Sequence, residues 1–312
     1  MKPNRPIKRV LVIKLGAMGD IVQATGPFTA IRRHHSDAHI TLLTTKLFRD
    51  FAAAGDWFDE VWIDDRPTWR QLRDWKASLK RLRRARFDRV YDLQTSDRTA
   101  ILFHLLGIGR KPEWSGTVVG CSHRHTNPQR DFIHTIERQA EQLGIAGIAD
   151  VPAPNLDGIS AEIGRFELSS PYVLLVPGSS PLRPDKRWPA GNYAELARRL
   201  IAKEITPVVI GGTAETQVAS AIATFCVGSR DLTTATSIVE IVELARGAAA
   251  AVGNDTGPMH VIATAGARSV VLFSHASDPD LCGQRGPDVT ILRRQPLGEL
   301  SVDEVEASLR LR

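Results

Sequence analysis

The chain has 312 residues, of which 43% are hydrophobic, and a formal net charge of +5. This composition is typical of a globular protein and excludes a disordered, collagen-like or disulfide-stapled chain. No run of about 18 apolar residues could span a bilayer, three distant cysteines favour a reducing compartment, and a chain of this length usually forms two hydrophobic cores. We therefore expect a cytoplasmic protein of two domains.

The predicted strands are short runs of Val, Ile and Leu that alternate with longer segments of helical period. Their continuous apolarity is typical of strands covered on both faces, which predicts parallel sheets with flanking helices, the α/β class. The eight runs are 9–15, 39–44, 60–63, 89–93, 172–176, 206–210, 248–253 and 268–273.

The domain boundary is predicted in a stretch rich in Pro, Gly and Ser between Gly144 and Pro171. We expect an N-terminal domain of residues 1–160 and a C-terminal domain of residues 161–312. Ser301 and Glu304 match a capping box that opens a last helix, 301–311, which we expect to pack back on the N-terminal domain.

The first informative loop follows the first strand, because ligands of open parallel sheets bind beyond the carboxyl ends of the strands. It runs from Lys14 to Asp20 and contains Gly16 and Gly19, a G-x-x-G pattern that differs from the dinucleotide fingerprint G-x-G-x-x-G. Asp20 stands at the start of the next helix. Its carboxylate either caps that helix or acts as a general base, and the sequence leaves both roles open.

A basic segment, residues 66–89, contains ten basic and two acidic residues, a net charge of +8. Its pattern predicts a helix from 68 to 86 with one apolar side. That side is predicted to contain Trp69, Leu72, Lys76, Leu79 and Leu82. The cations either form a solvated face or bind an anionic surface. Because no nucleic-acid-binding module is recognised, we favour an anionic membrane or a phosphorylated glycolipid.

Polar side chains follow the predicted strand at 89–93. Gln94 and Arg98 lie beyond its carboxyl end, and Arg98 is a candidate for binding a phosphate or carboxylate. Two nearby clusters contain residue types that bind metals. Residues 121–125 have no second pair at zinc-like spacing, and Asp64-Asp65 is adjacent and indicates a solvated turn, so no metal site is predicted.

Two loops of the C-terminal half suit a phosphorylated ligand. Residues 177–189 combine Gly and Ser with several cations, which is typical of either a phosphate loop or a solvated loop. Residues 253–260 lead into a helix at Pro258, and a helix N-terminus attracts phosphate. Asp255 either binds a sugar hydroxyl or caps that helix, and His260 by itself indicates a structural histidine.

A third candidate in this half is the Gly211-Gly212 turn with Glu215. The double glycine ends a predicted strand. Glu215 either binds the vicinal hydroxyls of a ribose or stabilises the first turn of the following helix.

Together these loops resemble glycosyltransferase family nine, the ADP-heptose:lipopolysaccharide heptosyltransferases. The motifs stand in family order across nearly the whole chain: Met18-Gly19-Asp20, Tyr91-Asp92-Leu93-Gln94, Pro177-Gly178-Ser179 with Lys186-Arg187-Trp188-Pro189, Gly211-Gly212 with Glu215, and 254–260. The resemblance implies a GT-B fold, in which two Rossmann-like domains face each other across a cleft. It also implies an inverting transfer of heptose from ADP-heptose to a lipopolysaccharide core or related glycolipid, without a cofactor or an obligatory metal.

The resemblance also implies roles for single residues. Asp20 would be the general base and Lys186 would contact the donor phosphates, so both are predicted to be catalytic. Glu215 would hold the ribose, Asp255 the transferred sugar and the backbone near Thr236 the adenine. The residues predicted to bind the donor are Gly19, Ser179, Ser180, Lys186, Glu215, Thr236, Asp255, Thr256, Gly257 and His260. The residues predicted to bind the acceptor are Gln94 and Arg98.

Three alternatives stay open. A member of the same family could use another nucleotide sugar or acceptor. A nicotinamide-dependent oxidoreductase shares the fold class, although Asp20 would repel a pyrophosphate. A non-catalytic nucleotide-binding protein would have the same loops. We expect a monomer whose partners are a nucleotide sugar, an anionic glycolipid and, through residues 66–89, the cytoplasmic face of the inner membrane, but not nucleic acid.

Overall fold

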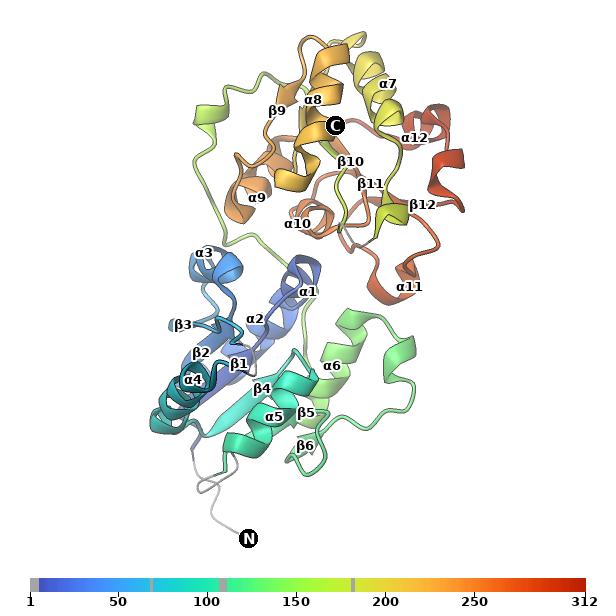
Figure 1. Ribbon diagram of the computed structural model, residues 1–312. Coiled ribbons are helices and arrows are strands. Elements are labelled where there is room, and N and C mark those ends of the chain that lie inside the picture. Colours follow the sequence, from blue (N-terminus) through green and yellow to red (C-terminus); the bar gives the residue numbers. More distant parts are fainter. Residues whose placement is uncertain (1–5, 68–69, 107–110, 181–182) are drawn as a thin grey trace. The chain divides into compact units, whose positions relative to one another are not determined.

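The computed structural model describes residues 6–67, 70–106, 111–180 and 183–312. The chain divides into two compact units, Met1–Pro154 and Asn155–Arg312, each with its own sheet (Figure 1). This division falls a few residues before the predicted boundary between residues 160 and 161.

The N-terminal unit contains a six-stranded parallel sheet in the order β3-β2-β1-β4-β5-β6. Its strands are β1 (Arg9–Ile13), β2 (His39–Thr44), β3 (Glu60–Ile63), β4 (Arg89–Asp92), β5 (Glu113–Gly116) and β6 (His123–Arg124). Its helices are α1 (Met18–Gln23), α2 (Thr25–His34), α3 (Arg49–Ala54), α4 (Leu72–Ala85), α5 (Asp97–Leu106) and α6 (Thr135–Ile145). Four consecutive residues of β1, 10–13, are fully buried, as expected of a central strand covered on both faces.

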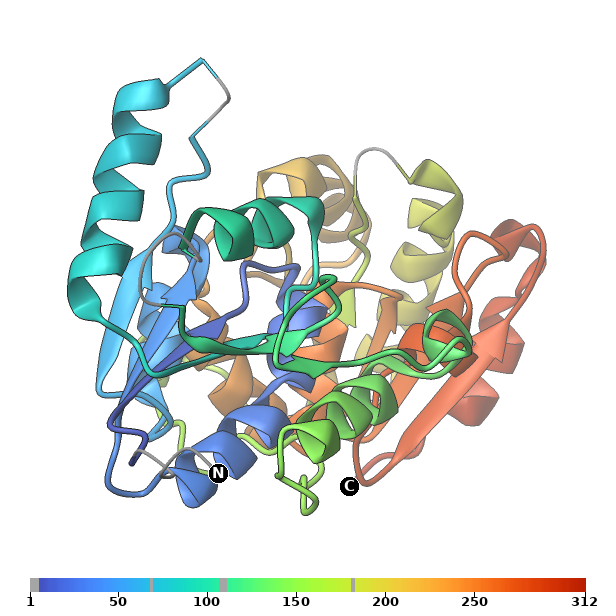
Figure 2. The ribbon, with the colours of Figure 1, turned by 90° about the horizontal axis from the view of Figure 1, so that it is seen from below.

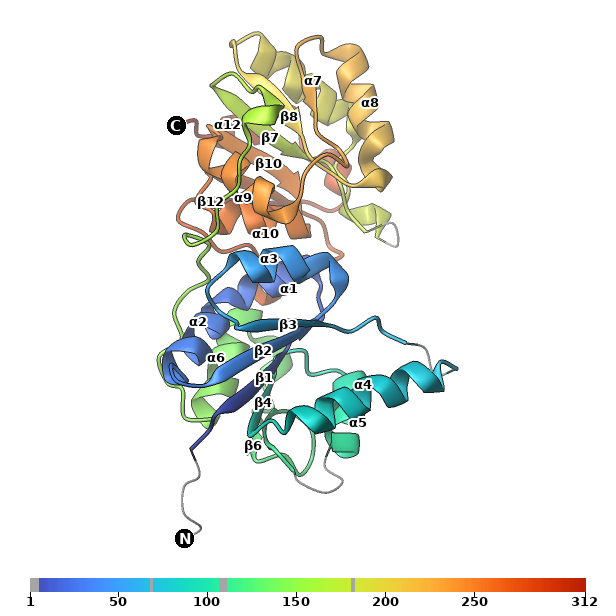
Figure 3. The same ribbon diagram turned by 90° about the vertical axis from the view of Figure 1, so that its left-hand side faces the viewer.

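Helices α4 and α5 lie on one face of this sheet, and α2 and α6 lie on the other (Figure 2). The core beneath α4 and α5 includes Leu11 of β1, Leu82 of α4 and Phe103 of α5. The first turns of α4 extend beyond the sheet (Figure 3). Among the side chains of α4 that the structure describes, only Leu82 is buried, so this helix is loosely packed.

The predicted apolar side of this helix is partly wrong. Lys76 is exposed, and Trp75 is the half-buried residue of that turn. Trp75 lies four residues before Leu79 and seven before Leu82, which is the spacing that places side chains on one side of a helix. The prediction for Trp69 falls outside the described residues.

The C-terminal unit repeats the architecture, with the order β12-β11-β10-β7-β8-β9 and parallel pairing throughout. Its strands are β7 (Tyr172–Val176), β8 (Thr206–Val209), β9 (Arg230–Asp231), β10 (Ala250–Asn254), β11 (Ser269–Phe273) and β12 (Val289–Arg293). Its helices are α7 (Ala190–Ile201), α8 (Thr216–Phe225), α9 (Ile238–Gly247), α10 (Gly257–Thr264), α11 (Pro279–Cys282) and α12 (Val302–Ser308).

Helices cover both faces of this second sheet as well. Val252 of β10 belongs to the core that α7 and α8 share with the sheet. Its neighbour Gly253 points the opposite way, toward α10, and a Cβ on Gly253 would lie 2.6 Å from the sulfur of Met259. Glycine is therefore required where α10 approaches the strand closely.

The last helix, α12, packs within the C-terminal unit. Its buried residue Val305 belongs to the core beneath α7, and Arg199 of α7 pairs with Glu306 at 2.8 Å. The predicted capping box is present, because Ser301 Oγ accepts from Glu304 N and Glu304 accepts from Ser301 N. Apolar burial against α7 attaches the helix to the C-terminal unit. The expected packing on the N-terminal domain stays a prediction.

The eight predicted strands are all present, and the α/β class with parallel sheets is confirmed. The sequence did not predict β5, β6, β9 and β12. Three of these lie at sheet edges, where one side of the strand meets solvent. Their polar and partly exposed residues do not form the continuous apolar run of a central strand.

Candidate functional site

The strand order of each sheet determines where a ligand would bind. In each unit the first strand lies beside the fourth. The strand order therefore reverses between β1 and β4, and again between β7 and β10, so the connecting segments on either side run in opposite directions along the sheet. Open α/β sheets bind ligands at the carboxyl ends of the strands beside this point. The candidate residues gather there in two groups, one in each unit.

Asp20 lies in the first turn of α1, directly after the loop that follows β1. Its Oδ2 accepts a hydrogen bond from the backbone N–H of Ala17 at 3.1 Å. This is the capping role, and it leaves Oδ1 without a hydrogen-bond partner among the residues that the structure describes. The geometry therefore permits a cap and a base in the same side chain. Gly19, in the same turn, is buried.

Gly16 shapes this loop. Its φ of +126° lies in a region that other residues rarely adopt, and a Cβ there would lie 3.0 Å from the ring of Phe48. The first glycine of the G-x-x-G pattern thus permits the turn that leads to Asp20.

Lys14 and Gln94 join the loop after β1 to the loop after β4. The buried ammonium of Lys14 donates to the carbonyl of Leu93 at 3.1 Å, and Gln94 Oε1 accepts from the backbone N–H of Leu15 at 2.8 Å. Burial lowers the pKa of Lys14, and the carboxylate of Asp20 opposes that shift. Gln94 therefore has a structural contact, and its predicted contact with an acceptor stays a prediction.

Asp92, at the end of β4, is almost completely buried. Burial raises its pKa to about 6, although the N–H groups of Thr95 and Gln94 donate to Oδ1 at 2.9 and 3.2 Å. These bonds hold the loop after β4 in place. The guanidinium of Arg130 also contacts this loop, donating to Thr95 Oγ1 at 2.9 Å.

Arg98 is held by another side chain. Its guanidinium donates to both carboxylate oxygens of Asp64, at 2.9 and 2.7 Å, and stacks on Trp75. Asp64, expected in a solvated turn, has a side chain only 11% exposed, so that expectation is wrong. The role of Arg98 on an acceptor phosphate stays a prediction.

The C-terminal group centres on Asp255, in the loop after β10. Its Oδ2 accepts from Lys186 Nζ at 2.5 Å and from Ser277 Oγ at 2.7 Å, and its Oδ1 accepts from Gln284 at 3.0 Å. Burial alone would raise the pKa of Asp255, but these hydrogen bonds and the Lys186 charge outweigh it, so the pKa is lowered. The carboxylate is therefore charged and directed at Lys186.

Asn254 joins the loops after β7 and β10. Its amide donates to the carbonyl of Pro177 at 2.7 Å, and its Oδ1 accepts from the backbone N–H of Trp188 at 3.1 Å. In the loop after β7, Arg187 donates to the hydroxyl and the carbonyl of Ser179, both at 3.1 Å. Ser179 is buried and Ser180 is exposed at the outer side of this loop.

Helix α10 begins at Gly257, with Thr256 as its N-cap. Thr256 Oγ1 is buried without a hydrogen-bond partner in the part of the chain that the structure describes. A helix N-terminus carries unsatisfied N–H groups and a partial positive charge, so it suits an anion. His260, one turn further along, is buried.

Glu215 and Thr236 lie further along the same sheet edge. Glu215 accepts from the backbone N–H of Gly212 at 2.8 Å, and a Cβ on Gly178 would lie 2.8 Å from its carboxyl carbon. The loop after β9, which holds the half-buried Thr236, is joined to this turn by a bond from Thr234 N to Gly211 O at 2.8 Å. The structure thus brings the loops after β7, β8 and β9 together.

The sequence did not indicate Asn254, Ser277 or Gln284 as parts of a shared network. Ser277 and Gln284 follow β11, so the rule that ligands bind beyond carboxyl ends of strands pointed to their loop. Ser and Gln are common in solvated loops, so their residue types alone did not indicate a role in the site.

The described residues contain no group of three His, Cys, Asp or Glu side chains placed to hold a metal ion. Among the described helices, none has the length and apolarity needed to cross a membrane.

The sequence profile of glycosyltransferase family 9 (heptosyltransferase) matches residues 75–305. Lipopolysaccharide heptosyltransferase 2 of Escherichia coli (strain K12) is 31% identical over 225 residues, which cover 64% of this chain and 63% of that protein. The match thus spans less than two thirds of this curated relative.

Solved structures are similar over nearly the whole chain. The E. coli ADP-heptose lps heptosyltransferase II superposes with a TM-score of 0.80 at 22% identity, covering 96% of this chain and 97% of the other. The E. coli heptosyltransferase WaaC with ADP superposes with a TM-score of 0.73 at 21% identity, covering 96% of this chain and 98% of the other. These similarities confirm the predicted GT-B fold class.

Proposed function

Because the chain belongs to glycosyltransferase family 9, we propose that it is an inverting glycosyltransferase that moves heptose from ADP-heptose to a lipopolysaccharide core or a related glycolipid. The observation that carries this proposal is the order of the candidate donor residues along one sheet edge. Family membership also decides against the nicotinamide-dependent oxidoreductase.

The donor residues follow neighbouring strands in the order β10, β7, β8 and β9. Asp255 follows β10, Lys186 follows β7, Glu215 follows β8 and Thr236 follows β9. An ADP-sugar has its parts in the matching order: sugar, diphosphate, ribose, adenine. We therefore assign the sugar to the loop after β10, the diphosphate to the loop after β7, the ribose to the loop after β8 and the adenine to the loop after β9. The solved E. coli WaaC contains ADP, which supports the same nucleotide.

The pairing of Lys186 with Asp255 suits the chemistry of the leaving group. A bound diphosphate attracts the Lys186 ammonium, which frees Asp255 to accept from sugar hydroxyls. As the bond from the anomeric carbon to the ADP oxygen breaks, negative charge grows on the diphosphate. Lys186 and the N–H groups of Thr256 and Gly257 then stabilise the transition state more than the ground state. These groups supply the positive charge that a metal would otherwise provide.

Asp20 is assigned as the general base. The acceptor hydroxyl gives its proton to the Asp20 carboxylate while its oxygen attacks the anomeric carbon on the side opposite ADP. One displacement of this kind inverts the anomeric configuration. The bond from Ala17 to Oδ2 holds the carboxylate in place and leaves Oδ1 for the proton.

The acceptor and the membrane are assigned to the N-terminal unit. Helix α4 presents several exposed cations, and each contributes about 1 kcal/mol of attraction near an anionic bilayer. We infer that this helix lies against the cytoplasmic face of the inner membrane, where a glycolipid acceptor is displayed, and that the protein acts as a monomer.

A donor screen tests the proposal. The melting temperature is measured with ADP, UDP and GDP, and turnover is then measured with ADP-heptose and a lipopolysaccharide core acceptor. We expect stabilisation by ADP, release of ADP in the presence of a chelator, and a product of inverted configuration by NMR. Stabilisation by UDP or GDP but not by ADP would overturn the donor assignment, and nucleotide binding without any turnover would favour the non-catalytic alternative.

A further inference from the structure

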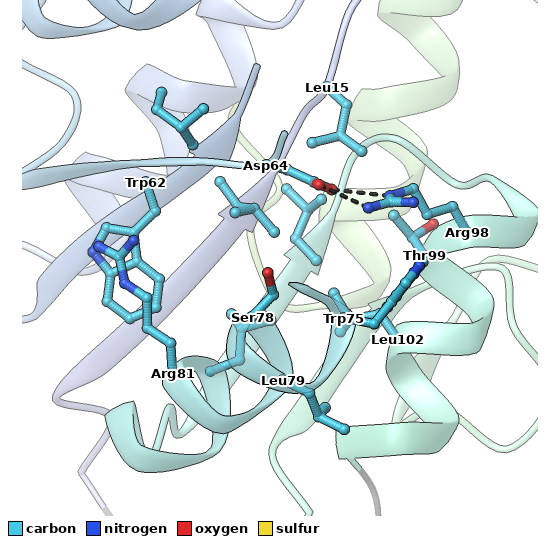
Figure 4. A pocket seen from close by; sticks show the side chains of 14 residues that line it. Leu15, Trp62, Asp64, Trp75, Ser78, Leu79, Arg81, Arg98, Thr99 and Leu102 are labelled. Atoms are coloured by element: carbon cyan, nitrogen blue, oxygen red, sulfur yellow. Dashed lines mark hydrogen bonds and ion pairs between the residues drawn. The ribbon is translucent and has the colours of Figure 1, made fainter. Parts of the chain in front are cut away.

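A pocket lies between α4, α5 and the sheet face that these helices cover (Figure 4). Its volume is about 60 Å³. Its walls are mostly apolar and include Ile13 of β1, Leu15 in the loop after it, Leu79 of α4 and Leu102 of α5. Two further lining residues, Ser78 and Arg81, are exposed, so the pocket opens to solvent along α4.

The two ends of the pocket differ in charge. At one end, Arg98 stacks on Trp75 and is neutralised by Asp64 at 2.7 Å (Figure 4). At the other end, the Arg81 guanidinium lies 3.8 Å from the ring centre of Trp62. The carboxylate of Glu60 also lies 3.8 Å from Arg81 and is half-exposed. This exposed ion pair is weak, so it compensates little of the positive charge of Arg81. An amphiphile would therefore place its anionic end at Arg81.

Further cations lie along α4. Five exposed residues in and just after α4 have no carboxylate within ion-pair distance in the described part of the chain. These are Arg73, Lys76, Lys80, Arg84 and Arg86. Beside them, the apolar side chains of Trp75 and Leu79 are only half-buried. The region thus combines uncovered apolar surface with uncompensated positive charge.

We propose that this pocket binds part of one acyl chain of an anionic membrane phospholipid, whose phosphate lies over Arg81, while the five unpaired cations in and just after α4 face neighbouring headgroups. The chain would cover the exposed apolar sides of Trp75 and Leu79, which is favourable because apolar surface leaves water. The cations extend along the whole helix, from Arg73 to Arg86, which matches a surface of many headgroups better than a single acceptor. This lipid site is separate from the donor-binding residues and goes beyond sugar transfer.

A pair of neighbouring substitutions tests the site. Ser78 lines the pocket and Ala77 does not, yet both are exposed on α4. Ser78→Phe fills the pocket, whereas Ala77→Phe adds the same ring to the adjacent surface. Binding is measured by co-sedimentation with vesicles of phosphatidylglycerol and of phosphatidylcholine. We expect Ser78→Phe to weaken binding to phosphatidylglycerol about tenfold, and Ala77→Phe to stay within about twofold of the wild type.

A soluble probe separates the chain from the headgroup. Below its micelle concentration, lysophosphatidylglycerol should raise the melting temperature of the wild type and of Ala77→Phe, but not of Ser78→Phe. Glycerophosphoglycerol, which has the same headgroup and no chain, should have no effect. Ser78→Leu, which adds less volume, replaces Ser78→Phe if the larger residue prevents folding.

Equal vesicle binding by the Ala77→Phe and Ser78→Phe variants would overturn the proposal, and so would a response to the lipopolysaccharide acceptor but not to lysophosphatidylglycerol. The outcome is independent of the proposed transferase function. Wild-type protein that turns over ADP-heptose but ignores phosphatidylglycerol would refute only the lipid site. Wild-type protein that binds the lipid but has no turnover would refute only the transferase.

Discussion

The two units have the same strand order, yet the buried aspartates at corresponding sheet edges behave in opposite ways. Burial raises the pKa of Asp92, at the end of β4, to about 6. Asp255, directly after β10, is also buried, but its pKa is lowered because Lys186, Ser277 and Gln284 donate to it. The charge of a carboxylate at this position thus depends on the donors that neighbouring loops bring to it, and the strand order does not decide it.

The difference divides the chemistry between the units. The C-terminal edge joins cations and a helix N-terminus, which suits a diphosphate leaving group. The N-terminal edge presents Asp20 beside a buried lysine and a backbone cap, which suits proton transfer. The same scaffold therefore supports two different half-sites, as expected when function is carried by loops.

The largest expected effect is a loss of sugar transfer that leaves ADP binding at the C-terminal sheet edge intact. Asp20→Asn removes the proposed base, so we expect transfer to fall by about 10²- to 10⁴-fold while ADP binding stays unchanged. Initial rates and calorimetric titration with ADP measure the two quantities. Asp50→Asn, a carboxylate in the first turn of α3, is the matched control and should keep its activity. Near wild-type transfer by Asp20→Asn would refute the base assignment.

Lys186→Met acts on the other edge. We expect a loss of about 10²- to 10³-fold in transfer, because the leaving diphosphate loses one cation, together with weaker ADP binding. Lys203→Met, which removes an exposed lysine paired with Glu306, should change neither quantity. If Lys186→Met bound ADP as tightly as the wild type, the diphosphate would have to lie elsewhere.

Asp92→Asn tests the contrast in pKa directly. The pKa of Asp92 rises from 3.8 to about 6 on folding, so the folded state holds the proton more tightly than the unfolded chain. Its contribution to the free energy of unfolding is present below about pH 4 and is lost as the pH rises through about 6, a change of about 2 to 3 kcal/mol.

Urea unfolding between about pH 4 and pH 7 measures this contribution as a difference between variants, because burial also lowers the pKa of His35 to about 4 and makes every variant more stable as the pH rises. Relative to the wild type, Asp92→Asn should become more stable by about 2 to 3 kcal/mol over this range, because it lacks the contribution that the wild type loses. Asp56→Asn, at an exposed position of the same unit, should follow the wild-type profile. A wild-type profile that rises over this range, with the same rise in Asp92→Asn, would contradict the assignment.

The smallest expected effect concerns α4. Replacing Lys80 and Arg84 with Ala should weaken binding to anionic vesicles by about 1 kcal/mol per residue, roughly fivefold each, because two exposed cations are removed. ADP binding should not change. The matched control removes Arg198 and Lys203, two exposed cations of the C-terminal unit. Equal losses in both double variants would mean that only net charge matters and that α4 has no special role.

The sequence predicted eight strands correctly, because most of their residues are covered on both faces and must be continuously apolar. It missed the short internal strand β5 and the edge strands β6, β9 and β12, whose pairing depends on a neighbour and not on their own composition. The helix α12 shows the same limit. Ser301 and Glu304 predict its first turn, but only packing shows that Val305 is buried against α7.

For the candidate site too, the sequence predicted some features and not others. Motifs at the carboxyl ends of predicted strands indicated Asp20, Lys186 and Asp255, because the loops of a parallel sheet meet at one edge. The side-chain partners of the candidate site residues, Arg98 included, could not be predicted. Gln284 lies 29 positions from Asp255, and Arg98 lies 34 positions from Asp64, so no local pattern connects them.

By itself, the sequence determined the α/β class, the two sets of strands and the loops that carry polar and charged residues, because each of these depends on local periodicity. The tertiary structure alone decided which charges meet. Lys186 reaches Asp255 across 69 positions, and five cations in and just after α4 have no carboxylate partner among the described residues, beside an open apolar pocket. The net charge of +5 is the same in either description. Its effect depends on distance and burial, which only the fold determines.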